Sequence, residues 1–94
     1  MQNLRLTWSH TWPDRPRDFV GMAAGGLRAG RIYHVVGTTN NPEHWFWACN
    51  GWYRGRGMNA SGQAPDKNTA ARMVEDAWFK AVERIDKDMG PMIP

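Results

Sequence analysis

The fold is decided by the stretch from Asp66 to Pro91, which has the sequence DKNTAARMVEDAWFKAVERIDKDMGP. Apolar residues recur in it at spacings of three and four, the pattern of a helix with one buried face. Asp66 suits the N-cap position, and Gly90 followed by Pro91 supplies a helix stop. The stretch therefore predicts a helix over about residues 67–89. Its apolar stripe comprises Ala71, Val74, Trp78, Ala81, Val82, Ile85 and Met89.

The residues upstream of this helix show the two-residue alternation of β-strands. Leu4, Leu6 and Trp8 share one parity, with polar residues between them. The segment after the last apolar strand is rich in glycine and arginine, which is typical of a mobile basic loop. The sequence thus predicts strands at about 3–10, 18–24, 27–36 and 44–53, and a basic loop over 50–65.

The second and third predicted strands form a hairpin about Gly25 and Gly26, because glycine tolerates the positive φ angles of a two-residue turn. The register that follows places these pairs opposite each other: Phe19 and Ile32, Val20 and Arg31, Gly21 and Gly30, Met22 and Ala29. Two facing glycines leave a notch where a helix or an indole ring approaches the sheet closely.

Three or four antiparallel strands followed by one long helix predict an α+β domain of two layers. The 94 residues suit a single domain, 1–94. No stretch approaches the roughly 20 apolar residues of a membrane span, and the N-terminus lacks the apolar run of a signal peptide. The lone Cys49 agrees with a reducing compartment. We therefore expect a cytoplasmic protein that does not contact membranes.

The sequence offers no pattern for catalysis or metal binding. Cys49 lies in an apolar strand, where a lone cysteine is usually a small core residue, and His10, His34 and His44 belong to other segments. Zinc ligands usually come in closely spaced pairs, which these residues lack. The glycine-rich segments carry no phosphate-loop motif. We therefore expect no enzyme activity, no catalytic residues, no metal and no cofactor.

The unusual features are six tryptophans and a basic N-terminal part. Residues 1–60 hold seven arginines against three acids, and the formal net charge of the chain is +3. One helix covers one face of a small sheet, so some aromatic rings remain exposed or pack beneath the loops. Tryptophan, tyrosine and arginine dominate interaction hot spots. The candidate partner-binding residues are Arg28, Arg31, Tyr33, Trp45, Trp47, Trp52, Arg54 and Arg56.

Two hypotheses follow from this composition. In the first, the aromatic and arginine face of the sheet binds a partner protein or a second copy of the chain. In the alternative, the arginines contact nucleic-acid phosphates while Trp45 or Trp47 stacks on a base. Small regulators and inhibitors from phages and mobile elements, including anti-CRISPR proteins, are typical of the first hypothesis.

Three short motifs also resemble a known group of proteins. Gly30-Arg31-Ile32-Tyr33, Trp45-Phe46-Trp47, and Gly62-Gln63-Ala64 before the helix with Ala77-Trp78 resemble a pattern of small uncharacterised alphaproteobacterial proteins, some from mobile elements. The resemblance covers about residues 8–80. It implies the same order of strands and helix, and it implies no activity.

Overall fold

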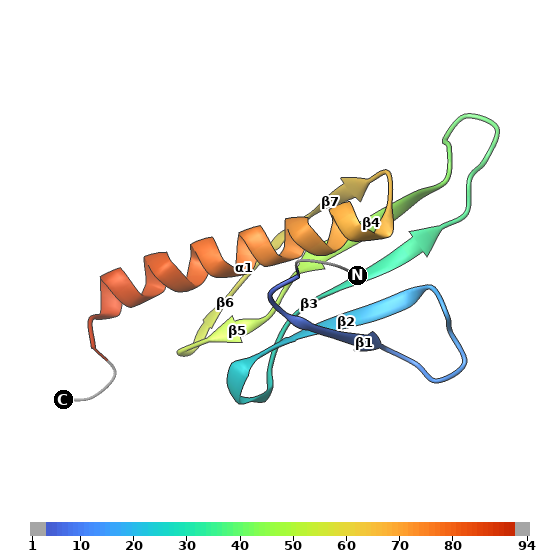
Figure 1. The fold of residues 1–94 in the computed structure, drawn as a ribbon. Coiled ribbons are helices and arrows are strands. Elements are labelled where there is room, and N and C mark those ends of the chain that lie inside the picture. The colour runs from blue at the N-terminus through green and yellow to red at the C-terminus, as the bar shows by residue number, and fades with distance from the viewer. Residues whose placement is uncertain (1–3, 92–94) are drawn as a thin grey trace.

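A computed structural model describes residues 4–91. In this part of the chain the elements are β1 (Thr7–His10), β2 (Asp18–Ala23), a short 3-10 helix (Ala24–Gly26), β3 (Leu27–Val35), β4 (His44–Cys49), β5 (Trp52–Tyr53), β6 (Arg56–Gly57), β7 (Ala60–Ala64) and α1 (Lys67–Met89). The main sheet is antiparallel, in the order β1-β2-β3-β4-β7, and β5 pairs with β6 separately. Because α1 lies across one face of the main sheet, the predicted α+β architecture is confirmed (Figure 1).

The helix α1 has the predicted bounds and the predicted caps. Asp66 Oδ1 accepts a hydrogen bond from the backbone N–H of Thr69 at 2.8 Å, and Gly90 follows the helix with a φ of 72°, which favours glycine. Most of the apolar stripe is buried against the sheet, whereas Met89 is 42% exposed. Met89 differs from the prediction because the last turn of the helix extends past the sheet (Figure 1).

The β2–β3 hairpin turns at Gly25 and Gly26, whose φ angles are 79° and 76°. Three of the predicted cross-strand pairs are present: Phe19 with Ile32, Val20 with Arg31, and Gly21 with Gly30. The fourth is wrong, since Met22 pairs with Arg28 after a register shift that leaves Ala29 as the extra residue. The carbonyl of Ala29 instead accepts a hydrogen bond from the backbone N–H of Gly51 at 3.2 Å.

The notch at the facing glycines is filled as predicted, by an indole on one side and by the helix on the other. A Cβ on Gly21 would come 2.9 Å from the indole of Trp8. A Cβ on Gly30 would come 2.8 Å from Cγ1 of Val74 on α1 and would overlap the carbonyl oxygen of Ala48. The two glycines therefore let the indole of β1 and the helix approach the centre of the sheet.

The N-terminal strand is shorter than the predicted 3–10, and residue 3 lies outside the described residues. β1 begins at Thr7, and the two residues before it are held by the helix instead of by a strand. The backbone N–H groups of Arg5 and Leu6 both donate to Glu75 Oε2 at 2.8 Å. The indole N–H of Trp8 donates to the same oxygen at 3.1 Å. A single carboxylate on α1 therefore anchors the start of the chain.

The segment 50–65 differs most from its prediction, because it contains three strands instead of a loop. Arg54 and Gly55 have φ angles of 52° and 81°, and they form the two-residue turn of the β5–β6 hairpin. The predicted strand 44–53 is accordingly interrupted between β4 and β5. At this break a Cβ on Gly51 would come 3.0 Å from Trp78 and would overlap the carbonyl oxygen of Arg28, so only glycine fits.

The strand β7 is the fifth strand of the main sheet and pairs with β4. Gly62 lies opposite Trp47, and Ala64 lies opposite Trp45. The small residues leave room for the large rings, since a Cβ on Gly62 would come 2.9 Å from Nε1 of Trp47. The core of the domain therefore reaches from the indole of Trp8 on β1 to the small side chains of β7.

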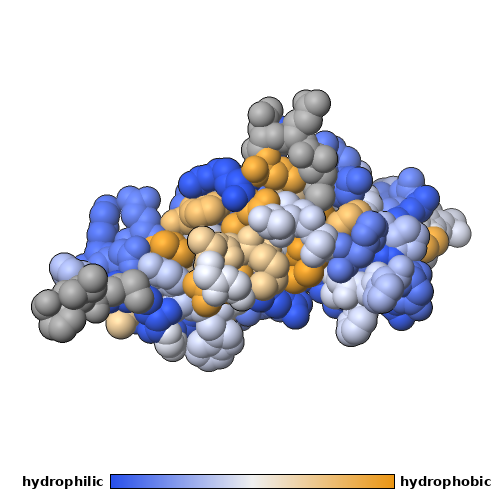
Figure 2. Space-filling model, turned by 60° about the horizontal axis from the view of Figure 1, so that its bottom comes forward, coloured by the Kyte–Doolittle hydropathy of each residue, from blue (hydrophilic) through white to orange (hydrophobic). Residues whose placement is uncertain are grey.

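Apolar side chains also gather on the surface, in the middle of the view in Figure 2. Among the described residues, no helix is long and apolar enough to cross a bilayer. The exposed large apolar side chains of the described chain are Trp12, Leu27, Val36, Trp52, Met73 and Met89.

Candidate binding surface

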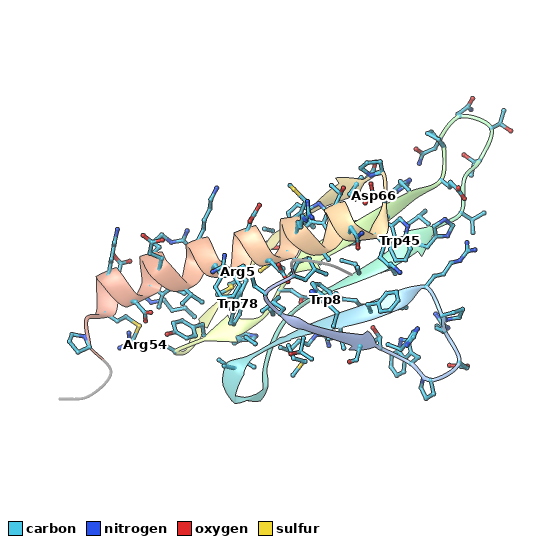
Figure 3. The ribbon with its side chains drawn as sticks, viewed as in Figure 1. Arg5, Trp8, Trp45, Arg54, Asp66 and Trp78 are labelled. Atoms are coloured by element: carbon cyan, nitrogen blue, oxygen red, sulfur yellow. The ribbon has the colours of Figure 1, made fainter. Side chains whose placement is uncertain are left out.

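The register divides the strand residues between a face covered by α1 and a face turned away from it. Trp45 and Trp47 lie on the covered face, so their expected role on an exposed face is wrong. Trp47 is 8% exposed beneath the helix. Trp45 is half-buried between the rings of Phe19 and His34, at centroid distances of 6.2 and 5.6 Å, near the N-terminal end of α1 (Figure 3). Strand alternation then sends Phe46 to the uncovered face.

Two cross-strand rows form the middle of the uncovered face, here called the outer face. Its central strands carry apolar and aromatic side chains around the charged pair Asp18 and Arg31, and its outermost strands β1 and β7 carry exposed polar side chains. The rings of Tyr33 and Phe46 lie 5.2 Å apart, and the guanidinium of Arg31 lies 4.8 Å from the Tyr33 ring centroid. The first row is Ser9, Val20, Arg31, Ala48 and Ser61, and the second is Asp18, Tyr33, Phe46 and Gln63.

An ion pair fixes the centre of the outer face. Arg31 Nε donates to Asp18 Oδ1 at 2.8 Å, and Arg31 Nη2 donates to Asp18 Oδ2, so the contact is bidentate. Asp18 is buried and Arg31 is half-buried. The hydrogen bonds from Arg31 lower the pKa of Asp18, although burial opposes that shift, and the same contact raises the pKa of Arg31. The Arg31 guanidinium is therefore held in place beside the Tyr33 ring.

Replacing Asp18 by asparagine should lower the free energy of unfolding by about 2 kcal/mol at neutral pH, since a charged hydrogen-bond partner is lost. The lowered pKa of Asp18 means that the folded state favours the carboxylate. This contribution is complete above the ordinary aspartate pKa of about 4, and it is lost as the pH falls through the lower pKa of the folded protein.

Urea unfolding of wild type and Asp18→Asn should therefore show a difference in unfolding free energy that shrinks as the pH falls through the acid range. The variant Asp14→Asn is the control, because Asp14 is an exposed aspartate in the adjacent β1–β2 loop. Its unfolding free energy should stay within about 0.5 kcal/mol of wild type. If the difference between wild type and Asp18→Asn stays the same down to the lowest pH, the ionised carboxylate of Asp18 does not stabilise the fold.

The predicted loop arginines are tied to the C-terminal end of α1, near which Figure 3 shows Arg54. Arg54 Nη1 donates to Asp86 Oδ1 and to the carbonyl of Gly90, both at 2.9 Å, and the Arg54 side chain is 9% exposed. Arg56 Nη1 lies 3.3 Å from Asp88 Oδ2. These contacts make the β5–β6 hairpin part of the folded domain.

Tyr53 strengthens the attachment of this hairpin to the helix. Its hydroxyl donates to Asp86 Oδ1 at 2.9 Å, and its ring meets that of Trp78 edge-on at a centroid distance of 6.0 Å. The hydrogen bond to the carboxylate is the main cause that raises the pKa of Tyr53. Of the remaining predicted site residues, Arg28 is exposed on β3 and Trp52 is 66% exposed on β5.

Sequence reasoning missed two residues that matter here. Phe46 was absent from the predicted site, although its parity with Ala48 and opposite to Trp47 marks it as the ring on the other face. Glu75 belonged neither to the predicted apolar stripe nor to the predicted site, yet it is 3% exposed. Its spacing gave a signal, because position 75 follows Ala71 by four and precedes Trp78 by three, within the buried stripe.

Cys49 is buried in the core, and His34 and His44 contact polar atoms of the loop before β4. Cys49 is 1% exposed, and burial raises the pKa of its thiol, which disfavours the nucleophilic thiolate. His34 Nε2 lies 3.2 Å from Glu43 Oε2, and His44 Nδ1 lies 3.0 Å from the carbonyl oxygen of Pro42. No group of three histidine, cysteine or acidic residues between positions 4 and 91 is placed to hold a metal ion.

The fold and the outer face define a two-layer α+β domain with one helix-covered and one uncovered sheet face. No protein-family model, curated protein or solved structure matches the chain.

Proposed function

We propose that the protein is a small non-enzymatic binding module whose outer face docks on a partner protein. The observation that carries the proposal is the placement of Tyr33 and Phe46, whose neighbouring rings occupy the middle of an uncovered sheet face. The regulator or inhibitor class suggested by the sequence, of phage or mobile-element type, belongs to the same proposal. So does a cytoplasmic location, which suits the single free cysteine.

The distribution of side chains on the outer face supports an interface. A solvated face of an antiparallel sheet usually carries polar side chains at its outward positions. Here β1 and β7 follow that rule with Ser9, Ser61 and Gln63, whereas the central strands place Tyr33 and Phe46 outward beside a single ion pair, Asp18 with Arg31. An apolar and aromatic centre within a polar rim is the usual anatomy of a protein–protein interface.

The arginines favour a protein partner over nucleic acid. Arg31, Arg54 and Arg56, three of the four arginines assigned to phosphate contacts, pair with Asp18, Asp86 and Asp88. A phosphate contact would compete with these pairs. Arg31 beside Tyr33 resembles the arginine and aromatic pairs of protein hot spots, where a preformed guanidinium loses little freedom on binding.

The double variant Tyr33→Ser, Phe46→Ser tests the proposal against the rim control Ser61→Ala, Gln63→Ala. Quantitative affinity capture from source cells, followed by reconstitution with the purified partner, should show binding at least about 100-fold weaker for the first variant only, as expected when two hot-spot rings are lost. Circular dichroism confirms that both variants fold. If the chain is its own partner, light scattering should show a dimer that only the first variant loses.

Two outcomes would overturn the proposal. One is a purified partner that binds the wild type and the Tyr33→Ser, Phe46→Ser variant equally well. The other is retention of a mixed oligonucleotide that weakens steeply with salt and is lost on replacing Arg28, which is exposed and, unlike Arg31, Arg54 and Arg56, has no ion pair within residues 4–91. That second result would favour the nucleic-acid alternative.

A further inference from the structure

A hollow lies on the helix side of the sheet, away from the outer face. It has a volume of about 350 Å³ and lies between α1, the residues before β1 and the turn of the β2–β3 hairpin. Apolar side chains gather in this region of the surface, in the middle of Figure 2. The lining residues are Arg5, Leu6, Ala23, Ala24, Leu27, Tyr53, Trp78, Phe79 and Val82. A volume of this size falls in the range of small-molecule sites.

The floor of the hollow is part of the core. Trp78 is 2% exposed and Leu6 is 7% exposed, so both are fixed by packing beneath it. The walls are partly open, since Phe79 and Val82 are half-buried and Leu27 is exposed on the opposite side. An apolar chain laid between these walls would cover surface that water now contacts, and each buried methylene would contribute about 0.8 kcal/mol.

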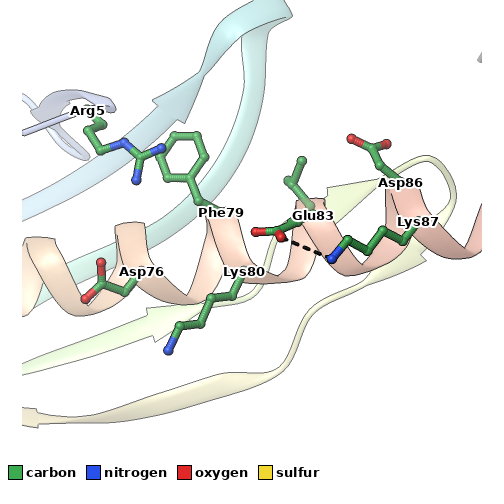
Figure 4. A pocket seen from close by; sticks show the side chains of 8 residues that line it. Arg5, Asp76, Phe79, Lys80, Glu83, Asp86 and Lys87 are labelled. Carbon is green, nitrogen blue, oxygen red and sulfur yellow. Dashed lines mark ion pairs between the residues drawn. The ribbon is translucent and has the colours of Figure 1, made fainter. Parts of the chain in front are cut away.

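Arg5 places one charge at the rim of the hollow. It is the only lysine, arginine or acidic residue that lines the hollow in the described chain, and its guanidinium carbon lies 3.7 Å from the Phe79 ring centroid. Figure 4 shows the Arg5 side chain beside the Phe79 ring. Arg31, Arg54 and Arg56 each contact a carboxylate, whereas no ion pair within residues 4–91 involves the Arg5 side chain. The Arg5 guanidinium is thus exposed, stacked and available to an anion.

The apolar surface is short, which limits the size of the ligand. Along α1 the hollow continues into a more open region of about 670 Å³ that is lined mainly by charged side chains. Two acids of that region are already paired, Glu83 with Lys87 at 3.4 Å (Figure 4) and Asp86 with Arg54 at 2.9 Å. A long amphipathic helix of a partner would therefore lay most of its apolar side against charges. A single alkyl chain fits the apolar part alone.

We propose that this hollow binds a small anionic amphiphile of the medium-chain fatty-acid class. The alkyl chain lies between Leu27 and Val82 above Trp78, and the carboxylate pairs with the guanidinium of Arg5. A planar guanidinium matches a carboxylate in a bidentate contact, which an alcohol of the same chain length cannot make. The site therefore selects its ligand by two properties: the negative charge of the head group at the rim, and the length of the alkyl chain in the hollow.

The test uses the full chain and decanoate, below its micelle-forming concentration, with decanol and acetate as comparison probes. We expect saturable decanoate binding, seen as a change in tryptophan fluorescence and as amide shifts confined to the β2–β3 turn, Tyr53 and the helix around Val82. Decanol should bind about tenfold more weakly, and acetate should produce no saturable change.

Two arginine variants distinguish a specific contact between decanoate and Arg5 from a general attraction of the anion to the positively charged protein. Arg5→Gln should weaken decanoate binding about tenfold and leave decanol binding unchanged. Arg72→Gln removes the same charge from an exposed helix position outside the hollow and should change neither. Arg5 is exposed and its hydrogen bond to the helix is made by its backbone N–H, so Arg5→Gln should fold.

The proposal is overturned if decanoate shows no saturable binding, if Arg5→Gln binds it as wild type does, or if the shifts map to the outer face. None of these outcomes bears on the protein partner, because the variants of Tyr33 and Phe46 lie on the opposite side of the sheet. Conversely, if the outer face proves not to bind a partner protein, the proposal of this ligand site is unaffected.

Discussion

Replacement of Glu75 by alanine should lower the free energy of unfolding by about 3 kcal/mol or more. The reason is that one oxygen, Glu75 Oε2, accepts from the backbone N–H groups of Arg5 and Leu6 and from the indole of Trp8. Without it, three donors in a buried or half-buried setting lose their acceptor. Urea unfolding measures the loss, and the Trp8 indole proton should also exchange faster with solvent.

Two further variants, at positions 75 and 76, serve as references for this effect. Glu75→Gln keeps one oxygen able to accept hydrogen bonds but removes the charge, so it should cost about half as much. Asp76→Ala removes an exposed carboxylate from the next position and should change the unfolding free energy by less than about 0.5 kcal/mol. Equal effects for Glu75→Ala and Asp76→Ala would refute the anchoring role.

Replacement of Gly30 by alanine should cost at least about 3 kcal/mol or prevent folding, at the upper end of overpacking effects. The added Cβ would overlap the carbonyl oxygen of Ala48, which is held in the β3–β4 ladder, and would press on Val74 of the helix. Neither the sheet nor the helix can move without disturbing the core. Thermal and urea unfolding of the purified variant measure the change.

The facing glycine provides the matched control. At Gly21 the atoms nearest to a Cβ belong to the indole of Trp8, a side chain and not backbone. The ring can shift at the expense of its hydrogen bond to Glu75, so Gly21→Ala should cost about 1–2 kcal/mol. A larger loss at Gly21 than at Gly30 would mean that the helix and β4 yield more easily than the indole does.

The elements predicted well from the sequence are those fixed by local chemistry. Asp66 and Gly90 mark the ends of α1, and the Gly25–Gly26 turn sets the β2–β3 register up to the bulge. The bulge itself was missed because it depends on the hydrogen bond between Gly51 and Ala29, which is made between distant parts of the chain. Local turn and cap preferences carry no information about that contact.

The strand β7 was missed because it lacks a strand's hydrophobic alternation. Its residues from Ala60 to Ala64 are small or polar, and they fit the sheet because the indoles of Trp45 and Trp47 need space opposite them. The candidate site failed for a related reason. Parity separates Trp47 from Phe46, but only the position of the helix decides which of the two is covered.

The expected phosphate contacts of Arg54 and Arg56 also depended on information that local sequence does not contain. Net charge and the Arg54-Gly55-Arg56 motif indicate a basic segment, yet their acidic partners Asp86 and Asp88 lie about thirty residues along the chain. Such pairs depend on tertiary structure, so composition overstates the free positive charge of this surface. Arg5 is the opposite case, since it carried no role in the sequence-based site.

The anchor at Glu75 also sets an order of events during protein synthesis. The residues it holds leave the ribosome before their acceptor, which follows 67 to 70 residues later. Until translation has passed the helix, the nascent β1 has no carboxylate to hold it, and the neighbouring edge of β2 stays open to foreign strands. The interval between these two moments is when this chain most needs a chaperone.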